Sequence, residues 1–230
     1  MAKKYVDLSV RIDDKTYGPP STNVRVSLVP NYRPPSKPGV KFDYWVATTV
    51  TMSVHTGSHM DVPSHNTKEG FSTDSLKVED FVSSAVVARL KGIDKNHGVT
   101  IEDIENSGVK FEKGEVVILN TNWTDKTWGK FPDYYVESPF LTVEAAEYLV
   151  SKKPHAVGFD FFPEYSARLK DFKSDDFVIH HMLLDHGVLM YQQMTNLSKV
   201  PDRFKIFAGI PKIGGIDGAP ARFIGEFDSP

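Results

Sequence analysis

A short segment of the chain concentrates side chains that can bind a divalent metal ion. Three of the eight histidines, His55, His59 and His65, fall within eleven residues, and Asp61 lies among them. Two imidazoles and a carboxylate form a typical site for an ion such as zinc or manganese. With His55, His59 and Asp61 as ligands, coordination positions stay open for water and substrate. The segment therefore predicts a catalytic metal centre.

The residues around these side chains suit a pre-organised turn. Gly57 lets the backbone turn close to an ion, and Ser58 offers a hydroxyl that can orient a ligand. Residues 46–54 alternate apolar with polar β-branched side chains, so we predict a half-buried strand that ends at His55. Gly57 and Pro63 disfavour a further strand or helix. We therefore place the histidines on a strand-to-loop transition.

The remaining pattern predicts a mixed α/β fold. Thr100 and Thr142 precede short amphipathic segments and can cap helices there. Strands outnumber helices and β–α alternation is confined to the middle, so we expect a mixed sheet or barrel flanked by helices. The other predicted strands are residues 5–10, 84–90, 115–119, 156–159, 188–191, 206–209 and 222–225, and the predicted helices are residues 101–105, 143–150 and 176–185.

Composition bounds the size of the protein and the class of its partners. At 230 residues, 40% hydrophobic and 25% charged, the chain predicts one globular domain spanning residues 1–230. The net charge of -3 provides no basic field for nucleic acid or anionic lipid, which favours a small-molecule substrate. The chain has no cysteine, which excludes thiol catalysis and thiolate ligands. No apolar run reaches the ~18 residues of a membrane helix and no signal core is present, so we expect no membrane partner and a cytoplasmic location.

Aromatic residues offer a stacking surface for a planar substrate, in competition with an ordinary place in the core. The region up to Gly39 holds six of the fifteen prolines and predicts a long, semi-rigid loop. That loop could present an aromatic ring over a pocket, or serve only as a surface connector. Trp123 and Trp128 are further candidates for the pocket. The aromatic residues at 42, 44 and 45 could instead be core.

The other five histidines lie outside this segment. His97, His155 and His186 stand alone and suit surface or hydrogen-bonded core positions. His180 and His181 would point about 100° apart on a helix, so at most one should face the pocket. A structural role for both stays open.

The segment of residues 55–65 resembles the signature His-x-Gly-Thr-His-x-Asp-x-Pro-x-His of the cyclase family of metal-dependent hydrolases, which includes kynurenine formamidase and isatin hydrolase. Every fixed position matches except Ser58, which replaces threonine and keeps the hydroxyl. The resemblance implies a swivelling β/β/α, cyclase-like fold. Further similarity covers residues 7–9, 138–141, 158–160, 180–184, 195–197 and 215–222.

The resemblance also implies a metal count. It makes His55, His59 and Asp61 the metal ligands. Family members with two zinc ions carry a bridging glutamate where this chain has Gln192. Without that carboxylate, Asp61 alone would offset the charge of two ions, so we predict one divalent ion, Mn²⁺ or Zn²⁺. Gln192 can contribute its amide oxygen as a further ligand.

Catalytic and substrate-binding roles follow from the resemblance as well. It makes His65 the general acid/base, and an unperturbed pKa of ~6.5 suits that role. His180 aligns with a family histidine near the metal, where it can donate a hydrogen bond to an oxyanion. Tyr17 stands near the position of a substrate-contacting tryptophan of the formamidases. We expect Tyr17 and Trp123 to contact the substrate.

Together these features predict a metal-dependent amidohydrolase. We rank ring opening of a cyclic or aryl amide, as in isatin hydrolysis, slightly above arylformamidase activity. A lactone hydrolase or lyase and a non-catalytic metal- or ligand-binding homologue remain open. His65 argues against lost catalysis, because metal binding alone does not need it. Family members are commonly dimers or larger, so we expect a homodimer or higher homo-oligomer.

Overall fold

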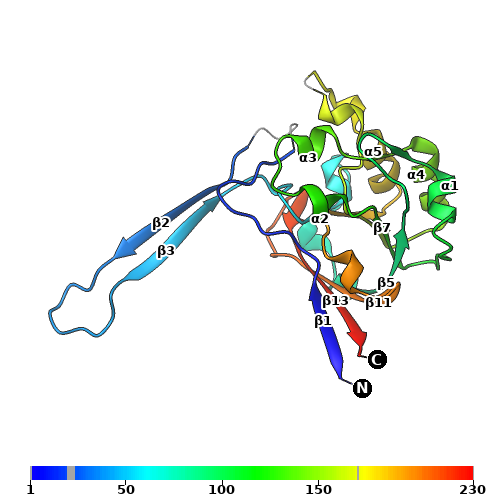
Figure 1. Ribbon diagram of the computed structural model, residues 1–230. Coiled ribbons are helices and arrows are strands. Elements are labelled where there is room, and N and C mark those ends of the chain that lie inside the picture. The colour runs from blue at the N-terminus through cyan, green and yellow to red at the C-terminus, as the bar shows by residue number, and fades with distance from the viewer. Residues whose placement is uncertain (1, 20–23, 170, 230) are drawn as a thin grey trace.

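A nine-stranded mixed sheet carries the fold in the computed structural model, which describes residues 2–19, 24–169 and 171–229 (Figure 1). Its strands are β1 (Lys3–Asp7), β4 (His59–Asp61), β5 (Val82–Arg89), β7 (Val116–Asn120), β9 (Ala156–Phe159), β10 (Leu189–Gln192), β11 (Arg203–Gly209), β12 (Gly218–Pro220) and β13 (Arg222–Asp228). Their order is β1-β13-β11-β5-β7-β9-β10-β4-β12. The four middle strands, β5, β7, β9 and β10, run parallel to one another. The strands on either side of them pair antiparallel. The expected mixed sheet is confirmed, and it ends on two edges rather than closing into a barrel.

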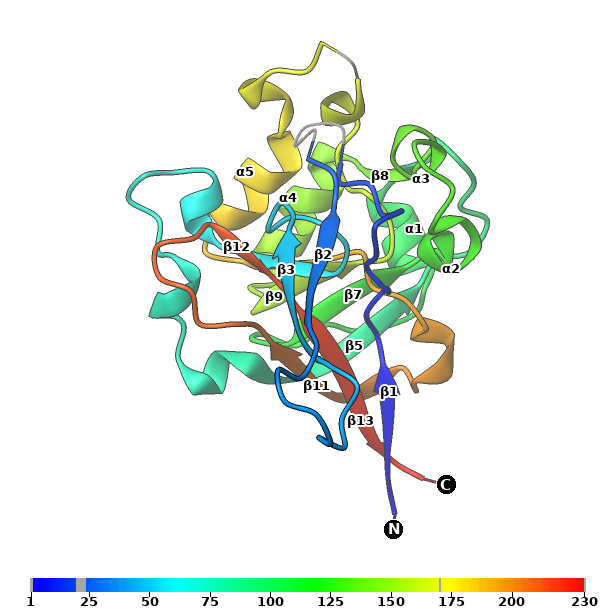
Figure 2. The same ribbon diagram turned by 90° about the vertical axis from the view of Figure 1, so that its left-hand side faces the viewer.

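Three of the α-helices pack against one face of this sheet (Figure 2). They are α1 (Ile101–Glu105), α4 (Val143–Ser151) and α5 (Val178–Leu184), while α2 (Trp123–Thr127) and α3 (Asp133–Val136) lie beside a smaller aromatic cluster. The predicted caps are confirmed, because Thr100 accepts a hydrogen bond from the backbone of Asp103 and Thr142 accepts one from the backbone of Ala145.

The central parts of the parallel strands are mostly apolar because both of their faces are buried there. Val117 and Leu119 of β7 pack beneath the helices, whereas Val116 and Ile118 contribute to a second core on the opposite face. Alternate side chains of a strand point to opposite faces, so a central strand of a covered sheet needs apolar residues at every position. The short apolar runs of the sequence therefore predicted these strands correctly.

Two expectations about the segment that leads to the histidines were wrong. The predicted half-buried strand is β3 (Trp45–Thr51), but all seven of its residues are exposed, and it pairs only with β2 (Ser27–Arg33). The proline-rich region is thus partly a strand rather than only a loop; Pro20 of that region lies outside the described residues. Pro30 is tolerated in β2 because the strand has a free edge.

The chain also re-enters a strand after His55, contrary to the expected strand-to-loop transition. Gly57 adopts a φ of +65°, a turn that reverses the chain, and β4 then begins at His59. Strands β10 and β12 flank β4 and satisfy its backbone groups on both sides. Pro63 follows only after β4 has ended, at the start of a 3₁₀ turn (Pro63–His65).

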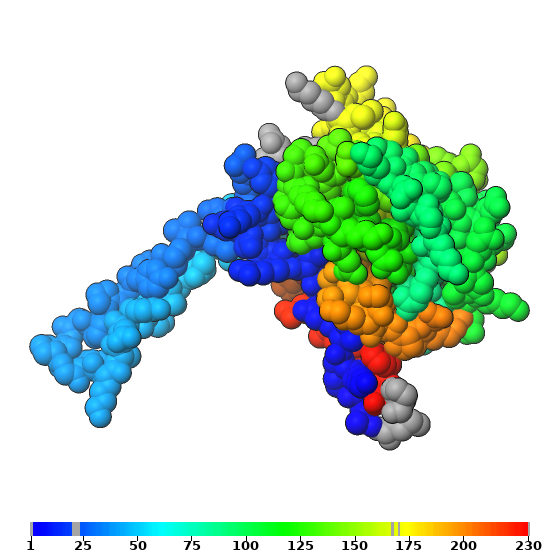
Figure 3. Space-filling model, viewed as in Figure 1, coloured from blue at the N-terminus to red at the C-terminus, as the bar shows by residue number. Residues whose placement is uncertain are grey.

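The pair of β2 and β3 forms a ribbon that projects away from the rest of the molecule (Figure 3). Trp45 at the start of β3 and Phe42 and Tyr44 in the loop before it are exposed, so they do not belong to the core. Two small strands, β6 (Gly98–Val99) and β8 (Phe140–Leu141), form a separate parallel pair. Within the described residues, no helix is long and apolar enough to cross a membrane.

A buried carboxylate just beyond β9 ties the carboxyl ends of two central strands together. Asp160 accepts hydrogen bonds from the side chain of Asn120 at 2.7 Å, from the backbone and hydroxyl of Thr121 at 2.9 and 2.7 Å, and from the backbone of Asn122 at 2.6 Å. Burial raises the pKa of Asp160 to about 6, against the effect of these donors.

We expect Asp160→Asn to lower the free energy of unfolding by about 2 kcal/mol, because its amide group turns a donor toward backbone N–H donors that then stay unsatisfied. Urea unfolding followed by circular dichroism measures the change. The matched control is Asp94→Asn at an exposed position, which should shift stability by less than about 0.5 kcal/mol. Equal midpoints for the two variants would contradict this role of Asp160.

Candidate metal centre and active site

Strand β4 and the turn before it bring His55, His59 and Asp61 together. Their ligand atoms lie within 4.8 Å of one another, and all three residues are buried. His55 Nδ1 is 2.7 Å and His59 Nε2 is 3.2 Å from the same oxygen of Asp61. Because His59 and Asp61 are two positions apart on a strand, they share one face of the sheet. This arrangement can hold a metal ion.

The neighbouring strands complete the centre. Gln192 of β10 pairs directly with His59, so its side chain lies on the same face. On the other side, Gly218 of β12 leaves room for the His55 ring. A Cβ added at Gly218 would lie 2.7 Å from His55 Cε1 and 3.1 Å from its Nδ1. Any side chain at position 218 would therefore displace His55.

Outer hydrogen bonds fix which ring nitrogen faces the centre. His59 Nδ1 lies 2.6 Å from the Gly57 carbonyl oxygen, which can only accept, so Nε2 is left for a metal. His180 Nδ1 lies 2.7 Å from the buried Glu164 carboxylate, which also accepts from the His180 backbone at 2.8 Å. His180 Nε2 consequently points inward, 3.8 Å from Asp61.

Gln192 provides a test of whether these residues suit a cation. Its Nε2 donates to Asp61 at 3.2 Å, but its buried Oε1 accepts from none of the described residues. A buried carbonyl oxygen without a partner is costly, and a cation would satisfy it. Two imidazoles, one carboxylate and one amide oxygen form a donor set that suits a divalent ion. The residues present thus fit a metal.

Protonation in the metal-free centre follows from its hydrogen bonds. Burial lowers the pKa of His55, but hydrogen bonds with Asp217 and Asp61 outweigh burial and raise that pKa to about 9. Burial likewise opposes ionisation of Asp61, yet His59 and His55 hold its pKa well below the usual value. Without metal, His55 is thus cationic and Asp61 anionic at neutral pH. A metal ion has to replace the His55 proton.

His65 approaches the centre from the 3₁₀ turn that follows β4. Its Nδ1 lies 2.8 Å from Asp217 Oδ2, and its ring centroid is 4.0 Å from that of His55. Burial lowers the pKa of His65 despite the hydrogen bond with Asp217, so the ring is neutral near pH 7 and can take up a proton. Asp217 had no role in the sequence analysis. Its only signal was its place in the family-like segment 215–222.

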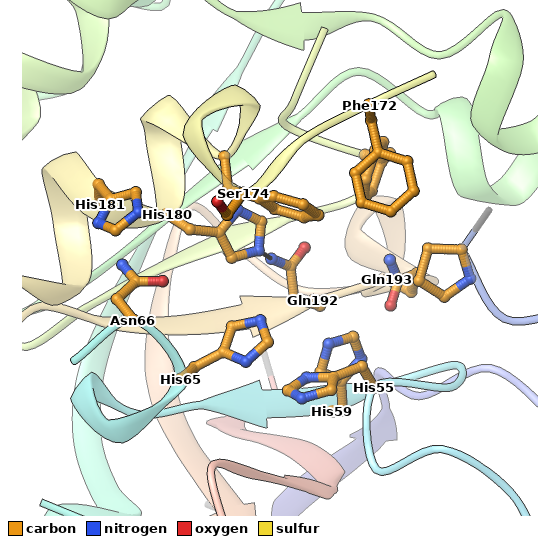
Figure 4. Close-up of a pocket in the computed structure, with 13 residues that line it drawn as sticks. His55, His59, His65, Asn66, Phe172, Ser174, His180, His181, Gln192 and Gln193 are labelled. Carbon is orange, nitrogen blue, oxygen red and sulfur yellow. Dashed lines mark hydrogen bonds between the residues drawn. The ribbon is translucent and has the colours of Figure 1, made fainter. Parts of the chain in front are cut away.

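The side chains of His55, His59, His65, His180 and Gln192 line a cavity of about 370 Å³ (Figure 4). The imidazoles and Gln192 form its floor, and Pro19, Phe162, Phe172 and Phe177 supply an apolar wall, with Asn66, Ser174, His181 and Gln193 as further polar lining. The segment that carries the three phenylalanines lacks a periodic pattern, so sequence reasoning missed them. His180 is buried in the cavity, whereas His181 is half-exposed at its mouth and bonds Asp185.

The structure does not bring Tyr17 or Trp123 to this cavity. Tyr17 stacks on Phe131 with ring centroids 5.7 Å apart and lines a neighbouring hollow instead. Among the described residues of that loop, Pro19, two residues further on, reaches the cavity. Trp123 packs in the aromatic cluster and donates its indole N–H to the Tyr134 carbonyl oxygen, and Trp128 packs beside it.

The other three histidines have ordinary structural partners, as the sequence analysis expected. His97 bonds the Asp103 carboxylate at 2.9 Å. His155 and His186 bond the carbonyl oxygens of Asp80 and Met182 at 3.0 and 2.8 Å. None of these three lines the cavity.

Comparisons with known proteins identify the family. Residues 6–163 match the model of the Cyclase family, described as "Putative cyclase". Kynurenine formamidase of Salinibacter ruber is 27% identical over 180 residues, covering 76% of this chain and 77% of that protein. That of Bacillus cytotoxicus is 27% identical over 176 residues, with the same coverage.

Solved structures share the fold over nearly the whole chain. An isatin hydrolase bound to the product analogue thioisatinate has a TM-score of 0.79 at 22% identity, covering 99% of this chain and 93% of that chain. Isatin hydrolase A from Labrenzia aggregata, bound to benzyl benzoate, has a TM-score of 0.77 at 22% identity, covering 97% and 93%. Because the family model matches more than half of its residues, this chain belongs to the cyclase family.

Proposed function

We propose that this cyclase-family hydrolase opens a cyclic or aryl amide with the help of one divalent metal ion. The observation that carries the proposal is the position of His65. A neutral imidazole, held by Asp217, lies beside the group of His55, His59 and Asp61 at the base of an apolar cavity. A protein that only binds metal has no need of such a base.

His55, His59, Asp61 and Gln192 would hold the ion. When bound, a divalent ion lowers the pKa of water and polarises a carbonyl group. His65 donates Nδ1–H to Asp217, so its Nε2 carries the lone pair that accepts the proton of the attacking water. The same nitrogen then returns that proton to the departing amide nitrogen. One residue can serve both steps because a neutral imidazole can accept a proton and then return it.

His180 is proposed to stabilise the developing oxyanion. Glu164 fixes its ring through two hydrogen bonds, and its Nε2 faces the centre. For this role Nε2 has to carry a proton in addition to Nδ1, and the Glu164 carboxylate, 2.7 Å from Nδ1, would offset the resulting charge. Such a preorganised donor is typically worth about 3 kcal/mol in the transition state.

The cavity favours a planar aromatic substrate. About 370 Å³ suits a small bicyclic ring, and Phe162, Phe172 and Phe177 offer apolar surface against it. We rank an isatin-like lactam first, supported by the structural likeness to isatin hydrolases. An N-formyl aryl amide comes second, supported by the curated relatives.

We expect the metal-supplemented protein to hydrolyse isatin, and N-formylkynurenine more slowly, with little turnover of a small aliphatic lactone. Absorbance assays on this panel measure the rates. His65→Ala should lower kcat by about 10²-fold or more and keep the metal, because it removes only the proton acceptor.

Several outcomes would contradict this assignment. Preferred turnover of the lactone would favour a lactone hydrolase or lyase. No turnover of any substrate, with tight metal retention, would favour the non-catalytic homologue. Full activity of His65→Ala would remove His65 from its role.

Metal binding should be limited to one equivalent and should strengthen with pH. His55 must lose its proton to bind the ion, and its pKa is about 9, so the apparent affinity should rise about tenfold per pH unit between roughly pH 6 and 8. Elemental analysis and calorimetry in buffers of different ionisation enthalpy measure the stoichiometry and the released proton. Asp61→Ala should abolish binding. Two equivalents of zinc per chain, or affinity independent of pH, would contradict the proposed centre.

We also propose that two copies associate through the ribbon of β2 and β3. Its register aligns Leu28 with Val50 and Tyr32 with Val46, so these four exposed side chains share one face. A two-stranded ribbon with an exposed apolar face is marginal in water by itself. Residues 27–51 carry three cationic residues and one aspartate, a net +2, against -3 for the whole chain and hence -5 for the remainder. This charge difference favours a second copy of the chain as the partner.

Light scattering should therefore give twice the chain mass, and Leu28→Glu combined with Tyr32→Glu should give the monomer. The change adds buried negative charge to an apolar contact. Val78→Glu, at an exposed apolar position on the body, is the matched control and should stay dimeric. A monomeric wild-type protein, or an unchanged mass in the ribbon variant, would contradict this association.

A further inference from the structure

Asp217 contacts two histidines that have different tasks. Its Oδ2 lies 2.9 Å from His55 Nε2 and 2.8 Å from His65 Nδ1. His55 belongs to both groups of residues that can hold a metal, one with His59 and Asp61 and the other with His65 and Asp217, and His65 is also the proposed acid/base. One carboxylate oxygen thus joins the two parts of the site, although 162 and 152 residues separate it in sequence from these partners.

The hydrogen-bond roles at both contacts are mutually consistent. An ionised carboxylate only accepts, so His55 donates through Nε2 and His65 donates through Nδ1. His55 then presents Nδ1 toward Asp61, and His65 presents the lone pair of Nε2 to the cavity.

The backbone around Asp217 is anchored independently of its side chain. The Asp217 carbonyl accepts from Val62 N at 3.2 Å, directly after β4, and Gly218 begins β12. Earlier in the same loop, Gly215 N donates to the Asp74 carboxylate at 3.0 Å. The loop is therefore fixed to the strand that carries the metal-binding residues, which sets the position of the carboxylate.

We propose that Asp217 is a positioning residue shared by the metal centre and the acid/base. It selects the Nδ1–H tautomer of His65 and orients His55 toward the ion, so that both histidines are set by one carboxylate. Outer carboxylates of this kind orient histidine ligands and raise their basicity. The proposal rests on the function proposed above, because only a hydrolytic role gives His65 its task.

The experiment uses the full-length protein and Zn²⁺ as the probe. We expect Asp217→Asn to weaken Zn²⁺ binding by about 10- to 100-fold, as measured by competition with a chelating dye. In the zinc-loaded protein, ¹⁵N NMR of the histidine rings should show that His65 changes from a single Nδ1–H tautomer to a mixture. Asp217→Glu keeps the carboxylate and should recover part of both properties.

Asp74→Asn is the matched control, because it weakens the anchor of the same loop but leaves the Asp217 carboxylate in place. It should keep Zn²⁺ affinity within about twofold of wild type and leave the His65 tautomer unchanged. Unchanged affinity and tautomer in Asp217→Asn would overturn the proposal. Equal losses in both variants would overturn it as well, since the loop rather than the carboxylate would then be responsible.

These readouts separate the positioning role from the proposed activity. Affinity and tautomer are measured without substrate, so they test Asp217 even if no member of the substrate panel is hydrolysed. Conversely, turnover with an unchanged tautomer in Asp217→Asn would support the activity and reject the positioning role.

Discussion

The pairing of β4 between β10 and β12 is the constraint on which the site depends. Three residues, His59 to Asp61, form a strand only because hydrogen bonds on both edges satisfy their backbone. That pairing places His59 and Asp61 on one face, sets Gln192 beside them, and requires a glycine at position 218 where the His55 ring lies. A loop would not hold these groups with the same precision, because its backbone is not fixed from both sides.

A second layer of acceptors makes the cluster of histidines chemically specific. The Gly57 carbonyl and Glu164 each accept from one histidine ring, and Asp217 accepts from two. In each ring the other nitrogen is left for the centre. The two nitrogens of one imidazole ring have different roles. The hydrogen bond to the outer acceptor decides which of them is free to bind a metal or a proton. Ligand, base and oxyanion donor can therefore all be the same residue type.

Burial explains why the unusual groups cluster in one place. Asp61 and Gln192 are removed from water, so an ion there is attracted more strongly than at the surface, and the unpartnered amide oxygen gains a contact it lacks. The exposed ribbon of β2 and β3 is the opposite case. Its apolar face is ordered without a covering layer in the single chain, which makes it the part of the fold with the most to gain from association.

The sequence by itself determined the central strands, the capped helices and a group of residues that can bind a metal. Those features depend on local spacing: apolar runs, a threonine before a helix, and histidines four residues apart. It predicted the strand before His55 as half-buried and missed β4. Both depend on hydrogen bonds to neighbouring strands, and the order of apolar and polar residues along the chain does not reveal those neighbours.

Only the tertiary structure decided which distant residues complete the site. Asp217 and Glu164 reach the histidines from far along the chain, and Tyr17 and Trp123 lie outside the cavity although their residue types suit it. Side-chain type fixes what a group can do chemically. Whether the group has that role depends on its neighbours in space. The packing of the sheet brings these neighbours together, and the spacing of residues along the chain does not encode them.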